Sequence, residues 1–277
     1  MGVRINTNIE ALIAQRNLAL TGTQLGRSVE KLSSGLRINR AADDAAGLAI
    51  SEKLRAQVRG LNQASRNAQD AISMVQTAEG ALNEVHAMLQ RIRELAVQYN
   101  NGTNDSGSQA AIEAEVEELA DAIGKVASQT KFNGVALLSG TGTTVTFQVG
   151  ANDGETLDVT FGGLDSGVAA VSAFIDSGNI SAVFSSGTAT ISAVDDAINY
   201  VSGMRGTFGA AQNRLEHTIN SLNVAAENLA ASESRIRDLD VAAEMVTFTK
   251  LQILQQAGTA ILAQANQAPQ SVLALLR

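Results

Sequence analysis

The C-terminal stretch of residues 251–276 constrains the fold of this chain more than any other segment. It contains no charged residue, although it holds nine large aliphatic residues and seven Gln or Asn residues. A membrane span needs about 20 predominantly apolar residues, and the seven side-chain amides together with Pro269 exclude one here. Small and aliphatic residues recur with the three- and four-residue spacing of an amphipathic helix at Leu251, Leu254, Gly258, Ile261 and Ala265.

The outer face of this predicted helix carries amides rather than charges. A helix on the surface of a soluble protein normally exposes Lys, Glu or Arg on that face, so we expect the segment to be covered on several sides. A single helix of this kind is only marginally stable in water. Its natural partners are the other end of the chain and other copies of the chain.

Residues 4–38 have the same character at the other end of the chain. Apolar residues recur there with helical spacing, and charges are sparse before Arg27. We therefore predict that the terminal helices pair as a coiled coil, with residues 1–45 and 238–277 forming one inner domain. The residues expected to build this pairing are Leu25, Val29, Leu32, Leu251, Leu254 and Ile261.

Residues 46–237 are predicted to form an outer core domain of long helices. Apolar heptad positions run from Leu48 to Tyr99, which indicates one very long helix. Residues 100–107 have the composition of a turn, and a second, antiparallel helix follows over residues 112–126. This part of the chain therefore favours helices that pack side by side.

The helical spacing gives way to a period of two in the middle of the chain. Residues 144–161 alternate around an Asn-Asp-Gly turn, the pattern of a β-hairpin. Residues 162–193 are rich in Gly, Ser and Ala and are predicted to be mainly loops, and helical spacing resumes near Val194. The expected fold class is mainly α, a long antiparallel helical rod or coiled coil with a small β-hairpin region.

Side chains that support catalysis are sparse in this sequence. There is no cysteine, and the two histidines, His86 and His217, lie outside the H-E-x-x-H spacing that binds zinc. The net charge is −8, and residues 132–204 contain acids but no Lys or Arg. Nucleic-acid binding needs clustered basic residues, so we expect no nucleic-acid partner, no catalytic residue, no metal and no cofactor.

The paired acids Asp43 and Asp44 admit two interpretations. Two adjacent carboxylates suit metal binding or acid–base chemistry, or they cap the helix that follows and neutralise Arg37 or Arg40. We expect the cap, because no histidine or further carboxylate lies close by in the sequence.

The N-terminal residues MGVRIN lack the charged and then apolar layout of a cleavable signal peptide. If the chain leaves the cell, we therefore expect it to use another route.

Several long motifs resemble those of bacterial flagellins. The N-terminal motifs are INTNIEALIAQRNL (5–18), KLSSGLRINRAADDAAGLAISEKLRAQVRGL (31–61), NAQDAISMVQTAEGAL (67–82), LQRIRELAVQ (89–98) and TKFNG (130–134). The C-terminal motifs are GAAQNRLEHTI (209–219), ENLAASESRIRDLD (227–240) and TKLQILQQAGTAILAQANQAPQSVLALL (249–276). The matches follow the family's order, and the short middle implies a minimal flagellin without large variable outer domains.

The resemblance implies a structural subunit that assembles into a helical homopolymer, the extracellular flagellar filament used for swimming. It implies that the terminal helices form the inner layer of that filament and the other elements the next layer outward. It also implies export in an unfolded state through the flagellar type III apparatus. The implied partners are other copies of the chain, an export chaperone, the filament cap protein and hook–filament junction proteins, with no membrane insertion.

The motif LQRIRELAVQ resembles the version of this segment that the flagellin-sensing Toll-like receptor of animals recognises. By that resemblance the contact candidates are Gln90, Arg91, Leu95 and, on the next helix, Glu115. The alternative is that the same side chains form contacts between subunits of a filament.

Three other functions compete with a filament subunit. A hook–filament junction protein shares the terminal helices, but the density of motif matches argues against it. A cytosolic coiled-coil adaptor would form a small, defined oligomer rather than a polymer. An enzyme is the third alternative, and the absence of a recognisable site in the sequence argues against it.

Overall fold

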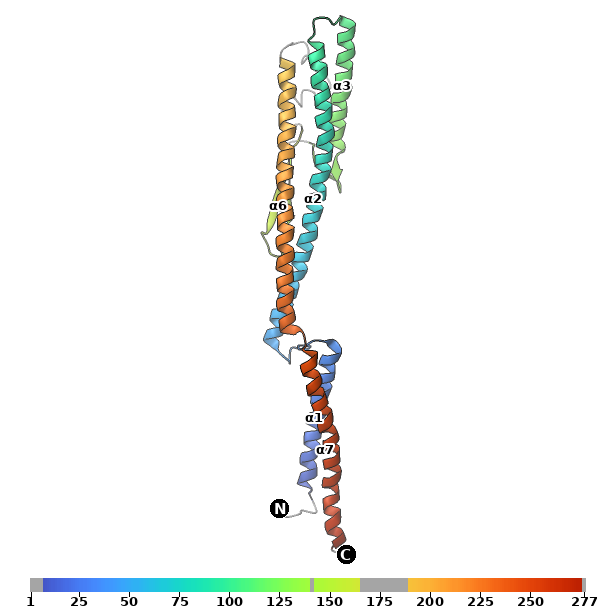
Figure 1. The fold of residues 1–277 in the computed structure, drawn as a ribbon, viewed down its shortest axis with the longest axis vertical. Helices are drawn as coiled ribbons and strands as arrows, with labels where there is room; N and C mark the ends of the chain where they lie inside the picture. Colours follow the sequence, from blue (N-terminus) through green and yellow to red (C-terminus); the bar gives the residue numbers. More distant parts are fainter. Residues whose placement is uncertain (1–6, 140–141, 165–188, 276–277) are drawn as a thin grey trace. The chain divides into compact units, whose positions relative to one another are not determined.

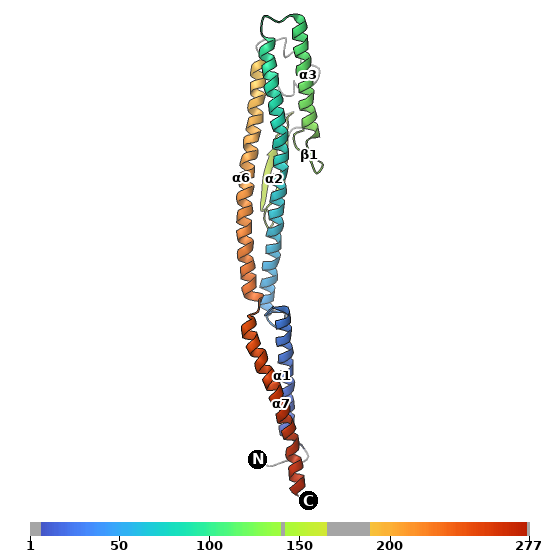
Figure 2. The same ribbon diagram turned by 45° about the vertical axis from the view of Figure 1, so that its right-hand side comes forward.

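A computed structural model describes residues 7–139, 142–164 and 189–275 of the chain. The helices are α1 (Ile9–Ser34), α2 (Ala45–Tyr99), α3 (Ser106–Gln129), α6 (Ala189–Arg237) and α7 (Val241–Leu275). The strands are β1 (Lys131–Phe132), β2 (Val135–Ala136), β3 (Thr143–Gln148) and β4 (Thr156–Phe161). Figures 1 and 2 show α1 beside α7, and α2 beside α3 and α6.

The predicted fold class is confirmed. Long helices dominate the described residues, and a hairpin of two six-residue strands, β3 and β4, accompanies them. Helix α6 begins at Ala189, earlier than the predicted Val194. Most of the segment predicted to form loops, residues 165–188, lies outside the described residues.

The chain forms two compact units. The terminal unit comprises residues 1–56 and 228–277, and the central unit comprises residues 57–227. The predicted domain boundaries at residues 45 and 238 lie next to the start of α2 and the end of α6, and that division stays a prediction. The compact units instead divide α2 after Ala56 and α6 before Asn228.

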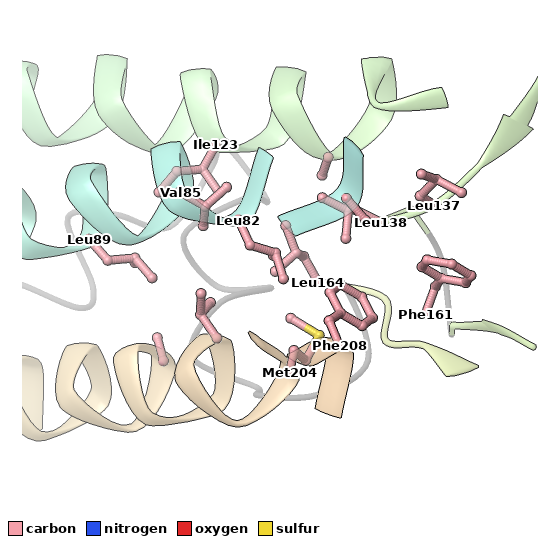
Figure 3. Packing of buried hydrophobic residues seen from close by; sticks show 14 of the residues in the cluster. Leu82, Val85, Leu89, Ile123, Leu137, Leu138, Phe161, Leu164, Met204 and Phe208 are labelled. Atoms are coloured by element: carbon pink, nitrogen blue, oxygen red, sulfur yellow. The ribbon is translucent and has the colours of Figure 1, made fainter. Parts of the chain in front are cut away.

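The core of the central unit lies where α2, α3, α6 and the hairpin meet (Figure 3). The predicted apolar heptad is fully buried there at Val75, Ala78, Leu82, Val85, Leu89 and Ile92. The ring centroids of Phe161 in β4 and Phe208 in α6 lie 5.3 Å apart, so one hairpin aromatic and one helix aromatic close the same core. Burial of such large apolar side chains is the main favourable contribution to folding.

The hairpin is the one predicted from residues 144–161. Strands β3 and β4 pair antiparallel from Thr143 opposite Phe161 to Gln148 opposite Thr156. The turn between them contains Gly154 at φ 83°, a conformation that glycine adopts without a steric penalty. Every second residue of β4 is buried, which places one face of the hairpin on the core.

The turn between α1 and α2 confirms the capping interpretation of the paired acids. Asp44 Oδ1 accepts a hydrogen bond of 2.8 Å from the Gly47 amide, and Asp43 Oδ2 accepts from the Arg40 amide at 3.0 Å. That backbone donor, followed by the amide of Asn39, lowers the pKa of the Asp43 carboxyl. The prediction that one of these aspartates neutralises Arg40 is wrong, because the Arg40 guanidinium pairs with Glu30 at 2.9 Å.

Helix α2 holds the hairpin through one polar contact and one close approach. The Asn67 side chain donates to the Gln148 carbonyl at 3.1 Å. A Cβ atom added to Gly60 would lie 2.9 Å from Ala151 Cβ and 3.3 Å from Ala151 Cα. Glycine at position 60 therefore lets the hairpin turn approach the helix.

We predict opposite effects for two glycine substitutions within α2. Gly80→Ala stabilises the central unit by about 0.5–1 kcal/mol, because alanine is the better helix former and nothing outside the backbone of α2 itself and the two neighbouring residues lies within 4 Å of the new Cβ. Gly60→Ala has the same propensity gain but crowds Ala151, and such overpacking costs about 1–3 kcal/mol. Urea unfolding followed by circular dichroism measures both, and equal stabilisation would contradict the close approach at Gly60.

Candidate functional site

Helices α1 and α7 pair along their lengths within the terminal unit (Figure 1). The pairing includes two polar contacts. Asn8 Nδ2 donates to the Ala265 carbonyl at 2.6 Å, and Ser28 Oγ donates to Glu244 Oε1 at 2.5 Å. Ser28 is 2% exposed, so its hydroxyl makes this contact inside the helix pair.

The buried and half-buried positions of α1 and α7 define a seam that consists largely of small and polar residues. In α1 they include Ala11, Ala14, Leu18, Thr21, Leu25, Ser28 and Leu32. In α7 they include Glu244, Phe248, Leu251, Gln255, Gly258, Leu262 and Ala265. A Cβ atom on Gly258 would lie 3.2 Å from Leu18 Cδ1, so the two helices approach closely at this glycine.

The structure divides the residues predicted for terminal pairing into two groups. Leu25, Leu32 and Leu251 lie in the seam. Val29, Leu254 and Ile261 lie outside it and are 48%, 46% and 60% exposed. The predicted register therefore requires a correction: three of the predicted aliphatic residues lie in the seam, whereas Val29, Leu254 and Ile261 lie outside it.

The large aliphatic residues that the seam leaves out form the terminal aliphatic surface. On α1 its members are Ile9, Leu12, Ile13, Leu20 and Val29, and on α7 they are Val241, Met245, Val246, Ile253, Leu254 and Ile261. Monomeric soluble proteins rarely expose so many large apolar side chains together, and such patches mark interaction sites.

Part of this surface on α7 is hollowed into an open groove of about 530 Å³. Met245, Val246, Ile253 and Leu254 line the groove, together with Thr249 and Lys250. Because its lining is chiefly apolar, the groove is suited to bind an apolar side chain of another molecule.

Ile13, Leu20, Val246 and Ile253 are not among the functional residues predicted from the sequence. One available signal was that apolar residues occur on more than one side of α1 and α7, a pattern typical of helices covered all round. Spacing alone assigns these residues to a second face without indicating what covers it.

The predicted receptor-contact residues lie in the central unit. Arg91 in α2 pairs with Glu115 in α3 at 2.9 Å and with Glu94 at 3.1 Å, and its side chain is 50% exposed. The hydrogen bond that the Arg91 guanidinium donates to Glu115, and then the one that it donates to Glu94, raises the pKa of the guanidinium. Gln90 is exposed beside it. These three candidates, Gln90, Arg91 and Glu115, are therefore available at the surface.

Leu95 is the exception among the receptor candidates. Its side chain is 1% exposed and belongs to the apolar core between the helices. The expectation that Leu95 makes a surface contact is therefore wrong for this structure. The two histidines differ from each other: His217 is exposed, and His86 is half-buried and lies 3.0 Å from the Gln90 amide nitrogen.

Within the described residues, no group of three or more His, Asp or Glu side chains is placed to hold a metal ion. Of the helices described, none has both the length and the apolar character needed to cross a membrane.

Two family models match most of the chain. The bacterial flagellin N-terminal helical region matches residues 5–143, and the bacterial flagellin C-terminal helical region matches residues 191–276. A flagellin of Halalkalibacterium halodurans is 53% identical over 99% of both chains. The flagellar filament 33 kDa core protein of Treponema phagedenis is 50% identical over 99% of both chains.

The fold also resembles a solved structure, that of a putative flagellar hook-associated protein from Vibrio parahaemolyticus. The TM-score is 0.56 at 16% identity, and the match covers 71% of this chain and all of the other. At that identity the similarity concerns the fold alone.

We predict that Ser28→Ala weakens the pairing of α1 with α7. The substitution leaves the half-buried Glu244 carboxylate without its hydroxyl donor, which costs about 1–3 kcal/mol. The exposed Ser33 in the same helix is the control, and Ser33→Ala is expected to stay within about 0.5 kcal/mol. Amide hydrogen exchange along α7 measures the difference, and equal exchange in the two variants would argue against a role for this contact.

Proposed function

Because the chain belongs to the bacterial flagellin family and is a structural subunit of the flagellar filament, we propose that the terminal aliphatic surface makes the contacts between copies. The single observation that carries this proposal is the exposure of the large aliphatic residues of α1 and α7. Ile253 and Ile261 are each 60% exposed, and Val246 is 71% exposed.

The distribution of residue types supports contact with further copies of the chain. The seam between α1 and α7 contains Gly258 and Ser28, which permit close approach but bury little apolar area. Large apolar side chains of both helices stay exposed and are left for other partners, Val246, Ile253 and Ile261 among them. Burying them stabilises a polymer by roughly 25 cal/mol per Å², and a heterologous contact of this kind repeats into a helical assembly.

We further propose the partners and route that family membership suggests. The chain reaches the extracellular filament without a cleaved signal peptide, held by an export chaperone before export and placed by the filament cap protein afterwards. The same terminal aliphatic surface would then be covered by the chaperone and later by other subunits. We propose that the protein has no catalytic activity.

A hook–filament junction protein is the second candidate within the same fold, and the Vibrio parahaemolyticus protein is the observation in its favour. The relatives near 50% identity are named flagellin or filament core protein, which favours the filament subunit. Labelled antibody and electron microscopy separate the two, because a junction protein marks only a short collar near the hook.

We also propose that unassembled subunits are recognised by the flagellin-sensing Toll-like receptor through Gln90, Arg91 and Glu115. The exposed ion pair between Arg91 and Glu115 joins α2 to α3 and offers charged groups of both signs on one surface. Arginine is a frequent hot-spot residue of protein interfaces.

We predict that Ile261→Glu prevents polymerisation while the subunit stays folded. A glutamate at this position would be desolvated without a partner in the filament, and such burial costs several kcal/mol. The critical concentration for assembly should therefore rise on the order of a hundredfold. Sedimentation and electron microscopy after salt-induced assembly measure it.

The matched control for that variant is Val224→Glu in the central unit, where Val224 is 58% exposed. It introduces the same charge at nearly the same exposure outside the terminal aliphatic surface. The proposed location of the contacts would be refuted if Ile261→Glu assembled normally. It would also be refuted if both variants lost assembly to the same extent.

We predict that Arg91→Ala lowers the potency of the monomer on receptor reporter cells about tenfold, because hot-spot residues typically contribute more than 1 kcal/mol. Arg93→Ala is the control, since Arg93 is about as exposed and pairs with Asp195 instead. Undiminished activation by Arg91→Ala would remove this residue from the proposed surface.

A further inference from the structure

The methionines of this chain differ sharply in their exposure to solvent. Met245 on α7 is 46% exposed, whereas Met74 and Met204 in the core of the central unit are 4% and 7% exposed. Figure 3 shows the Met204 side chain among the apolar residues of that core. Met88 is half-buried and packs against the same core. Of the methionines in the described residues, Met245 is therefore the most accessible to a reagent in solution.

Met245 belongs to the part of α7 that the seam leaves uncovered. It follows Val241 by four residues and precedes Ile253 by eight, so these three exposed side chains lie along one side of the helix. Met245 also lines the open groove of about 530 Å³, together with Val246, Ile253 and Leu254. Methionine is unbranched and flexible, so its thioether adapts to apolar side chains that approach such a groove.

The thioether sulfur of Met245 is the atom at this position that an oxidant attacks. The chain has no cysteine, so every sulfur atom in it belongs to a methionine. A sulfur lone pair attacks one oxygen of hydrogen peroxide, the O–O bond breaks, and the other oxygen takes the remaining proton and leaves as water. The sulfur is oxidised by two electrons, and the peroxide is reduced. The product is methionine sulfoxide, a polar and chiral side chain that a reductase converts back to methionine.

We propose, on the basis of the assembly surface proposed above, that Met245 is a reversible oxidation site that controls association of the chain and that reacts with peroxides. As a thioether, Met245 is covered by another copy without the loss of a strong hydrogen bond to water. As a sulfoxide, it carries an acceptor oxygen, and covering that oxygen with apolar side chains removes its hydration without compensation.

The polar residues of the groove do not offset this cost. The Thr249 hydroxyl already donates to the Met245 backbone carbonyl at 2.8 Å. Lys250 also lines the groove, but an ammonium drawn to the sulfoxide would bring a charge into the contact, where it would be desolvated. Oxidation of one sulfur atom therefore opposes assembly while the two helices of the terminal unit stay paired, because Met245 lies outside their seam.

The test treats the unassembled full chain with dilute hydrogen peroxide and follows each methionine by peptide mass spectrometry. Tryptic peptide 238–250 contains Met245 and no other methionine. We expect Met245 to gain one oxygen atom before the three methionines of the central unit do, and to be protected once the chain has polymerised. The critical concentration for assembly should rise on the order of tenfold after oxidation. Two methionine sulfoxide reductases, one for each sulfoxide epimer, should together restore it.

Met245→Leu and the matched control Met88→Leu assign the effect to one sulfur atom. Each variant is compared with itself before and after peroxide, so a difference in basal assembly does not enter. We expect peroxide to leave the critical concentration of Met245→Leu unchanged and to raise that of Met88→Leu as in the wild type. Both variants keep Met1, so oxidation there affects them equally. A peroxide effect that survives Met245→Leu, or equal oxidation rates at Met245 and Met204, would overturn the proposal.

Ile261→Glu separates this proposal from the assembly surface on which it rests, because it alters that surface without sulfur chemistry. If Ile261→Glu blocks assembly but the Met245 sulfoxide assembles normally, the surface stands and the oxidation site is refuted. If Ile261→Glu assembles normally but oxidation of Met245 still prevents assembly, the oxidation site stands and the extent of the surface is refuted.

Discussion

Close approach of α1 and α7 is the contact on which the terminal unit depends. Gly258 faces Leu18, and Ser28 donates to Glu244 inside the pair. Small residues at these positions bring the backbones together, and leucines such as Leu25 and Leu251 fill the seam beside them. Other large aliphatic side chains of both helices lie outward, at Val246, Ile253 and Ile261 among others. A helix pair built in this way is suited to association with further copies.

The central unit is built on the opposite arrangement, because its large apolar residues face inward. Leu82, Leu89 and Ile92 of α2 are fully buried, and Phe161 brings the hairpin into the same core. Its helix surface carries charged pairs, such as Arg91 with Glu115, that are satisfied without another chain. The central unit therefore buries its large apolar side chains within itself, whereas the terminal unit leaves many of its own exposed.

The sequence by itself determined the element types, the hairpin, the cap at Asp44 and the family. These follow from local properties: residue spacing, turn chemistry and long motifs that need no knowledge of distant contacts. Only the tertiary structure decided that Ser28 rather than Val29 lies in the seam and that Leu95 is buried. The reason is that α1 and α7 have apolar residues on more than one face, so several registers satisfy the same spacing. The choice among them depends on how closely the two backbones approach, which is a property of the packed pair.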